Sequence, residues 1–189
     1  GHEVPEGAIL LVHGGTGGIG STAIQLGKAM GCRVFSTADG PEGVAYAEEL
    51  GAEKGIDFRS EDFVPIVREA GGANIILDII GGDYVARNIK ASAPDARIIS
   101  LAFNQGSKIE IDLMPMMLKR LSLTGSTLRS RPDAFKSAVA AELRAKVWPK
   151  FGEGKLRTLT DTVLPLGEAA KAHALMESGK HKGKILLKP

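Results

Sequence analysis

The stretch from Ala8 to Gly31, AILLVHGGTGGIGSTAIQLGKAMG, constrains the fold more than any other. It opens with an apolar run, residues 9–12, that predicts a short buried strand, and a cluster of glycines follows. Apolar residues then recur at helical spacing, which predicts a helix that ends at Gly31. The predicted apolar face of this helix consists of Ile19, Ala23, Leu26 and Met30.

Three glycines in this strand–turn–helix segment, Gly15, Gly17 and Gly20, match the pattern G-x-G-x-x-G. Such glycines permit a tight turn, let the backbone approach a pyrophosphate and let the helix pack closely on the strand. The helix N-terminus then offers free N–H groups to the phosphates. The segment therefore predicts a dinucleotide-binding loop; the alternative is a glycine-rich turn that holds no ligand.

The following residues alternate short apolar runs with helical patterns, as a parallel sheet covered by helices requires. Further strands are expected at 33–37, 54–57, 74–80, 97–102 and 121–126. Helices are expected to begin at Pro41 and near Asp62, to follow Gly81-Gly82-Asp83, and to run as one long helix over 132–151. Six strands alternating with helices predict an α/β fold, a Rossmann doubly wound parallel sheet of order 3-2-1-4-5-6.

The end of the chain differs from this pattern. Residues 156–164 predict a strand, 167–178 a helix and 184–187 a final strand, and these elements extend no obvious edge of the six-stranded sheet. We therefore divide the chain into a Rossmann domain that binds NAD(P), residues 5–152, and a C-terminal segment, residues 153–189, that belongs to a second structural unit.

Composition narrows the class of partner. The 189 residues carry 24 Lys and Arg against 22 Asp and Glu, so a net charge of +2 gives no reason to expect nucleic acid or a membrane as a partner. One cysteine, Cys32, makes no intrachain disulfide and favours a reducing, cytoplasmic location. That cysteine and four scattered histidines give no metal-ligand spacing, so no metal is expected; the histidines are His2, His13, His173 and His181.

Four segments resemble the zinc-independent quinone oxidoreductase branch of the medium-chain dehydrogenase/reductase superfamily: LLVHGGTGGIGSTAIQLGKAMG, ILDIIGGDYVARN, MMLKRLSLTGSTLRSR and HKGKILLKP. The similarity runs from about Pro5 to Pro189 and covers the C-terminal, nucleotide-binding half of such enzymes. It implies NAD(P)H-dependent hydride transfer from the nicotinamide to a quinone or another conjugated carbonyl, such as an enone. It also implies a homodimer through edge strand 121–126, and a tail that completes a GroES-like catalytic domain absent from this chain.

The same resemblance implies the cofactor-binding residues. The pyrophosphate loop falls on Thr16, Gly17, Gly18 and Ile19, and the adenosine side on Asp39 and Phe58. Gly81 follows the fourth strand, and the nicotinamide side falls on Leu101, Ala102, Phe103, Thr127 and Leu128. Lys184 is expected to reach the cofactor cleft. No catalytic acid or base is assigned, and His13 and Asp78 are interpreted as hydrogen-bonded structural groups.

Cofactor choice depends on where the sequence departs from its relatives. Members that prefer NADPH usually have a small residue at position 39, a hydroxyl at 40, a lysine at 43 and a tyrosine at 58. This chain has Asp39, Gly40, Gly43 and Phe58 instead. A carboxylate suits the ribose 2′-hydroxyl of NADH and repels a 2′-phosphate, although Arg59 offers a guanidinium that could bind that phosphate. We expect NADH to bind at least as tightly as NADPH.

Two other functions stay open. One is a nucleotide-binding module without catalysis of its own, and the other is a reductase of α,β-unsaturated (enoyl) thioesters. The substrate itself cannot be chosen, because the resemblance places most of the substrate pocket in the other half of such enzymes.

Overall fold

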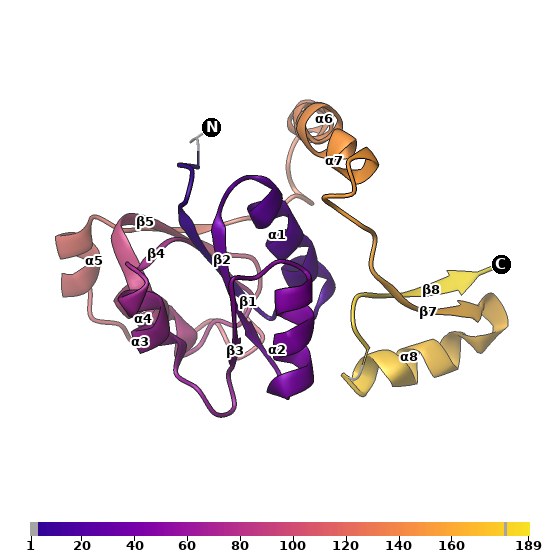
Figure 1. Ribbon diagram of the computed structural model, residues 1–189, viewed down its shortest axis with the longest axis horizontal. Coiled ribbons are helices and arrows are strands. Elements are labelled where there is room, and N and C mark those ends of the chain that lie inside the picture. Colours follow the sequence, from indigo (N-terminus) through magenta and orange to yellow (C-terminus); the bar gives the residue numbers. More distant parts are fainter. Residues whose placement is uncertain (1–3, 180) are drawn as a thin grey trace.

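A computed structural model describes residues 4–179 and 181–189, and its centre is a six-stranded parallel sheet (Figure 1). The strand order is β3-β2-β1-β4-β5-β6, as predicted. The bounds are β1 Ile9–His13, β2 Arg33–Ala38, β3 Lys54–Asp57, β4 Ala73–Asp78, β5 Ser92–Ser100 and β6 Ser122–Gly125. The Rossmann fold class is therefore confirmed.

Helices cover both faces of the sheet and bury one apolar layer on each side (Figure 1). The helices α1 Gly18–Ala29 and α2 Gly40–Glu49 cover one face, and α3 Phe63–Glu69 and α4 Tyr84–Ala91 cover the other. A short helix, α5 Met114–Lys119, precedes β6. Asp62 caps α3 as expected, because its carboxylate accepts the N–H of Val64 at 3.1 Å.

The buried face of α1 is not the one that apolar spacing predicted. Ile19 and Met30 are 51% and 47% exposed, whereas Ile24 and Gly27 are buried. A Cβ on Gly27 would lie 2.5 Å from Cδ2 of Leu10, so this glycine lets the helix lie close on β1. The closeness of helix and strand, rather than the size of the apolar side chains, therefore decides which face turns inward.

The long helix predicted over 132–151 forms as one continuous helical run over 133–152, but a π-helical turn that the sequence did not predict divides it. The segment consists of α6 Asp133–Glu142, a π-helical turn η1 Leu143–Val147 and α7 Trp148–Gly152, with none of its side chains fully buried. Pro149 has no N–H to close an α-helical bond to the fourth residue before it, which accounts for the wider turn just upstream.

The C-terminal segment forms its own small sheet, in agreement with the prediction that it extends no edge of the large one. Strands β7 Thr160–Pro165 and β8 Lys184–Lys188 pair in parallel, and the turn η2 Leu166–Glu168 and helix α8 Ala169–Glu177 connect them. The segment is attached to the Rossmann unit by Gln25 of α1, which exchanges two hydrogen bonds with the backbone of Arg157, at 2.9 and 3.3 Å. The domain boundary at 152/153 stays a prediction. Within the described residues, no helix is long and apolar enough to cross a membrane.

Candidate functional site

The centre of the sheet has the geometry at which open α/β sheets bind ligands. Strand β1 lies between β2 and β4, and the helices that follow β1 and β4 lie on opposite faces. At such a switch point the loops at the carboxyl ends diverge and leave a crevice. The loop after β1 holds the predicted residues Thr16 and Gly17, the first turn of α1 holds Gly18 and Ile19, and the loop after β4 holds Gly81.

The loop after β1 is shaped for an anion. Its two close approaches require glycine, because a Cβ on Gly15 would overlap Oγ of Ser36 and one on Gly20 would overlap the carbonyl oxygen of Gly14. The first backbone bond of α1 runs from the N–H of Ser21 to the oxygen of Gly17 at 2.9 Å, so the earlier amides have no partner within the helix. No acidic residue lies in the first turn. The residues present therefore fit a pyrophosphate, and its binding here stays a prediction.

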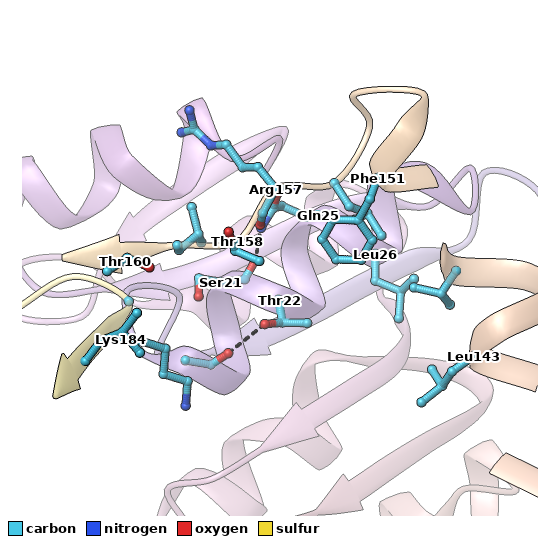
Figure 2. A pocket seen from close by; sticks show the side chains of 16 residues that line it. Ser21, Thr22, Gln25, Leu26, Leu143, Phe151, Arg157, Thr158, Thr160 and Lys184 are labelled. Atoms are coloured by element: carbon cyan, nitrogen blue, oxygen red, sulfur yellow. Dashed lines mark hydrogen bonds between the residues drawn. The ribbon is translucent and has the colours of Figure 1, made fainter. Parts of the chain in front are cut away.

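Lys184 adds a positive charge to the same loop. A Cβ on Gly18 would lie 2.5 Å from Nζ of Lys184, which places the ammonium group directly over the start of α1 (Figure 2). The backbone beside it is held to the loop, because the N–H of Gly183 donates to the oxygen of Thr16 at 3.2 Å. The C-terminal segment therefore brings Lys184 to the cleft, as expected.

The predicted adenosine side lies at the ends of β2 and β3. Asp39 accepts two interactions from Arg59: Nη2 donates to Oδ2 at 2.8 Å, and Nε pairs with Oδ1. The carboxylate of Asp57 accepts hydrogen bonds from the backbone N–H groups of Arg59 and Gly40, at 3.1 and 3.0 Å. These bonds hold the pKa of its carboxyl below the usual value, and the bond from Arg59 has the largest effect. A polar cavity of about 450 Å³ borders this pair, and Phe58 is half exposed nearby in the chain.

The predicted nicotinamide side forms where β4, β5 and β6 end. Gly81 has φ +70°, and a Cβ there would lie 2.8 Å from Cδ1 of Phe103, so glycine lets the loop after β5 close over it. The N–H of Leu101 donates to the oxygen of Asp78 at 2.8 Å. The next turn, after β6, holds Thr127 and Leu128, both exposed. All twelve predicted cofactor-binding residues, Ala102 among them, thus follow the carboxyl ends of the strands; their contacts with a cofactor stay predictions.

Sequence reasoning missed a buried polar network beneath these loops. His13 at the end of β1 lies 2.7 Å from Oδ1 of Asn88 and 3.1 Å from Oγ1 of Thr37, and all three are buried. Burial lowers the pKa of His13 to about 4, with a smaller opposing effect of the bond to Asn88. This confirms His13 as hydrogen-bonded. Asn88 lies among apolar residues on the inward face of α4, and a polar residue on that face was the available signal.

A second unpredicted feature is a largely apolar cavity of about 470 Å³ beside α1 (Figure 2). It lies between α1, the segment 143–151 and the C-terminal segment, and Lys184 stands at the end nearest the phosphate loop. Its main apolar side chains are Leu26, Leu143, Val147, Phe151 and Leu186. Three apolar residues of the segment 143–151 thus line this cavity: Leu143, Val147 and Phe151.

Comparison with known proteins decides the family. The model of the zinc-binding dehydrogenase family matches residues 18–143. The chain belongs to this family. The match confirms the resemblance to the medium-chain superfamily seen in the sequence.

Among individual relatives, quinone oxidoreductase of Sus scrofa is 28% identical over 97% of this chain and 55% of its own length. A phenolphthiocerol/phthiocerol polyketide synthase of Mycobacterium tuberculosis is 30% identical over 98% of this chain but only 8% of its own length. A solved mycobacterial structure complexed with NADPH aligns at TM-score 0.82 and 25% identity, over 98% of this chain and 58% of that one. The chain therefore spans about half the length of the quinone oxidoreductase and of the mycobacterial structure, and less than a tenth of the length of the synthase.

The family name refers to zinc, and the residues present do not fit a zinc site. In residues 4–179 and 181–189, no group of three or more His, Cys, Asp or Glu side chains is placed to hold a metal ion. His2 lies outside the described residues.

Proposed function

We propose that this chain is the cofactor-binding part of an NAD(P)H-dependent reductase that transfers hydride to a quinone or another conjugated carbonyl. The observation that carries the proposal is the loop after β1, where the free amides at the start of α1 and the ammonium of Lys184 converge on one anion site. The quinone oxidoreductase and the 2-haloacrylate reductase among the relatives support this reaction class.

In this proposal the residues of the chain bind the cofactor, orient it and exclude water from the site. The amides at the start of α1 hold the pyrophosphate, and Lys184 neutralises part of its charge. Leu101, Phe103 and Leu128 offer apolar side chains at the far end of the cleft. Phe103 and Leu128 are 51% and 55% exposed in this chain, and we propose that the bound nicotinamide covers them and that together they keep water from the reacting carbon. The bound nicotinamide supplies the hydride. None of the described residues is assigned as acid or base.

For the cofactor, we propose, as the sequence predicted, that NADH binds at least as tightly as NADPH. The cations around the predicted 2′ position already have carboxylate partners, Arg59 with Asp39 and Lys182 with Glu42 at 3.6 Å. A 2′-phosphate would have to compete with these carboxylates for its counter-charge. The relative complexed with NADPH argues the other way, so measured affinities decide.

An enoyl-thioester substrate is the second candidate. Its support is the 30% identity with a mycobacterial polyketide synthase over nearly the whole chain. A nucleotide-binding module without catalysis is the third. Comparing a small quinone with an enoyl thioester as acceptor separates the first two, and the absence of turnover with both, in the full-length protein, would favour the third.

We also propose self-association through β6. Within residues 4–179 and 181–189 this outer strand pairs only with β5, and Leu123 on it is 38% exposed. The neighbouring helix α5 leaves Met114, Met117 and Leu118 more than half exposed. An apolar edge strand flanked by apolar side chains suits pairing with its own copy about a two-fold axis. We infer a cytoplasmic location from the single cysteine alone.

Calorimetric titration with NADH and NADPH, followed by cofactor oxidation with a small quinone, tests the proposed function. We expect binding but slow turnover, because this chain spans about half the length of the quinone oxidoreductase. Failure to bind either cofactor would contradict the proposal. Rapid turnover by the 189-residue chain would contradict the expectation that a second domain is required.

A further inference from the structure

A continuous chain of buried hydrogen bonds connects the two loops that flank the switch point. At one end the carboxylate of Asp78 accepts the N–H groups of Ile80 and Gly81, at 2.7 and 3.0 Å. Its other oxygen accepts Nδ2 of Asn88 at 3.2 Å. The amide of Asn88 thus joins the loop after β4 to the interior of α4.

The direction of each remaining bond follows from this end. The Asn88 amide nitrogen faces a carboxylate, so its oxygen faces His13 and must accept a hydrogen bond from Nε2–H at 2.7 Å. Nδ1 of the neutral ring is then an acceptor, and the hydroxyl of Thr37 donates to it at 3.1 Å. The Thr37 oxygen in turn accepts the N–H of Gly14 at 3.3 Å. The network therefore ends on the loop after β1.

The surroundings hold the His13 ring in place and keep it dry. The rings of Phe63 and Tyr84 meet it edge-on, each 4.9 Å between centroids, and the guanidinium of Arg87 covers both of these rings. Thr37, His13, Asn88 and Asp78 are at most 1% exposed. Hydrogen bonds in such a site have a fixed direction and a high cost of breaking, whereas apolar packing tolerates sliding.

We propose that His13, through Thr37 and Asn88, is a positioning residue that fixes the loop after β1 relative to the loop after β4. This rests on the proposed function, in which the first loop holds the pyrophosphate and the second faces the nicotinamide half of the cofactor. A ligand that contacts both loops gains from their fixed spacing, and a ligand that contacts only the first does not.

Two ligands and two pairs of variants test this. NADH spans both loops, and ADP contacts only the first. Asn88→Leu and Thr37→Val remove network bonds with little change of volume. Thr37→Ser restores the hydroxyl. Ser92→Ala is the matched control, because it removes the buried hydrogen bond that the Ser92 hydroxyl donates to the backbone carbonyl oxygen of Asn88 at 2.7 Å, and it removes no bond of the network.

We expect Asn88→Leu and Thr37→Val to weaken NADH binding at least about tenfold and ADP binding less than about twofold. Ser92→Ala should lower stability but leave both affinities unchanged, and Thr37→Ser should restore NADH binding. An equal loss for both ligands, or no loss, would overturn the proposal. If Asn88→Leu does not fold, the Thr37 pair decides alone.

Amide hydrogen exchange without ligand keeps this test separate from the proposed function. Thr37→Val should speed exchange of the Gly81 amide, at the far end of the network, at least about tenfold, while Ser92→Ala should not. Unchanged exchange at Gly81 would refute the coupling. If the unmodified protein binds neither NADH nor ADP but the exchange result holds, then the proposed function fails and the coupling between the loops stands.

Discussion

Arg59 and Asp39 form a two-point ion pair at the mouth of the predicted adenosine site, with Nη2 of Arg59 2.8 Å from Oδ2 of Asp39. The two partners have opposite effects on cofactor choice, because the carboxylate repels a 2′-phosphate and a free guanidinium would attract it. While the guanidinium is bound to Asp39, a 2′-phosphate meets a neutralised cation next to a carboxylate. Both side chains are exposed, at 68% and 49%, so solvent weakens the effect without removing it.

We therefore predict that Asp39→Asn shifts the ratio of NADPH to NADH affinity about tenfold toward NADPH, which corresponds to about 1.4 kcal/mol. The measurement is a calorimetric titration of both cofactors. Asp95→Asn is the control, because Asp95 makes a similar exposed two-point pair with Arg120, at 2.7 and 2.6 Å, on another part of the chain. NADPH already bound tenfold tighter by the unmodified protein would refute the argument.

The structure also explains why restoring the groups of NADPH-preferring relatives is difficult here. A Cβ on Gly43 would lie 3.3 Å from both Ala38 Cβ and Thr16 Cγ2, so Gly43→Lys needs a small backbone or side-chain shift. Gly40 has φ +65°, a conformation that strains a serine. The single change at Asp39 is therefore the cleaner test.

Two glycines of the loop should respond differently to the same methyl group. In Gly20→Ala the new Cβ would overlap backbone atoms of Gly14, so we expect a loss of about 2–3 kcal/mol of unfolding free energy and of dinucleotide binding. In Gly17→Ala the nearest atom, the Gly14 oxygen, is 3.6 Å away, and a loss of about 1 kcal/mol or less is expected. Urea unfolding with cofactor titration would measure both, and equal effects would show that the loop is not built around Gly20.

The sequence predicted what depends on local pattern. Alternating strands and helices with one handedness leave few possible strand orders, so the order of the sheet could be predicted. The family resemblance, rather than the pattern, assigned residues as distant as Thr16 and Leu128 to one cleft, and the structure places both after the carboxyl ends of strands of the same parallel sheet. The inward face of α1 could not be predicted, because Gly27 sets it through a contact with Leu10 on another element. Likewise, no local pattern pairs Gln25 with Arg157, which lie 132 residues apart.

The stability of the fold should depend on the charge of His13. Its pKa is about 4 when folded and near 6.5 when unfolded, so between these pH values the unfolded chain binds more protons. Stability is then complete above pH 6.5 and falls as the pH drops toward 4, by about 3 kcal/mol in total. Urea unfolding from pH 7 to 4 should show this fall, and in His13→Gln, which does not titrate, the remaining slope should be smaller. Parallel slopes in the two proteins would exclude His13 as the cause.

Lys184 should contribute to dinucleotide affinity through its charge. Its ammonium lies over the start of α1, whereas Lys188, on the same strand, is exposed at the strand's far end. We predict that Lys184→Ala weakens NADH binding about fivefold at low salt and less at high salt, because screening reduces the contribution. Lys188→Ala should have no effect. A loss that does not depend on salt would indicate that the lysine stem packs on the loop rather than that its charge binds the cofactor.

Self-association can be tested at the outer strand. Leu123 is the exposed apolar residue in the middle of β6, and a lysine there places a charge where a second copy would pair, as natural edge strands do to prevent pairing. We predict that light scattering at micromolar concentration gives the mass of a dimer for the unmodified protein and of a monomer for Leu123→Lys. Val163→Lys is the matched control, because Val163 is 56% exposed on β7 of the separate two-stranded sheet. A monomeric unmodified protein would refute the interface, and dissociation by both variants would show that added charge, rather than the β6 edge, is responsible.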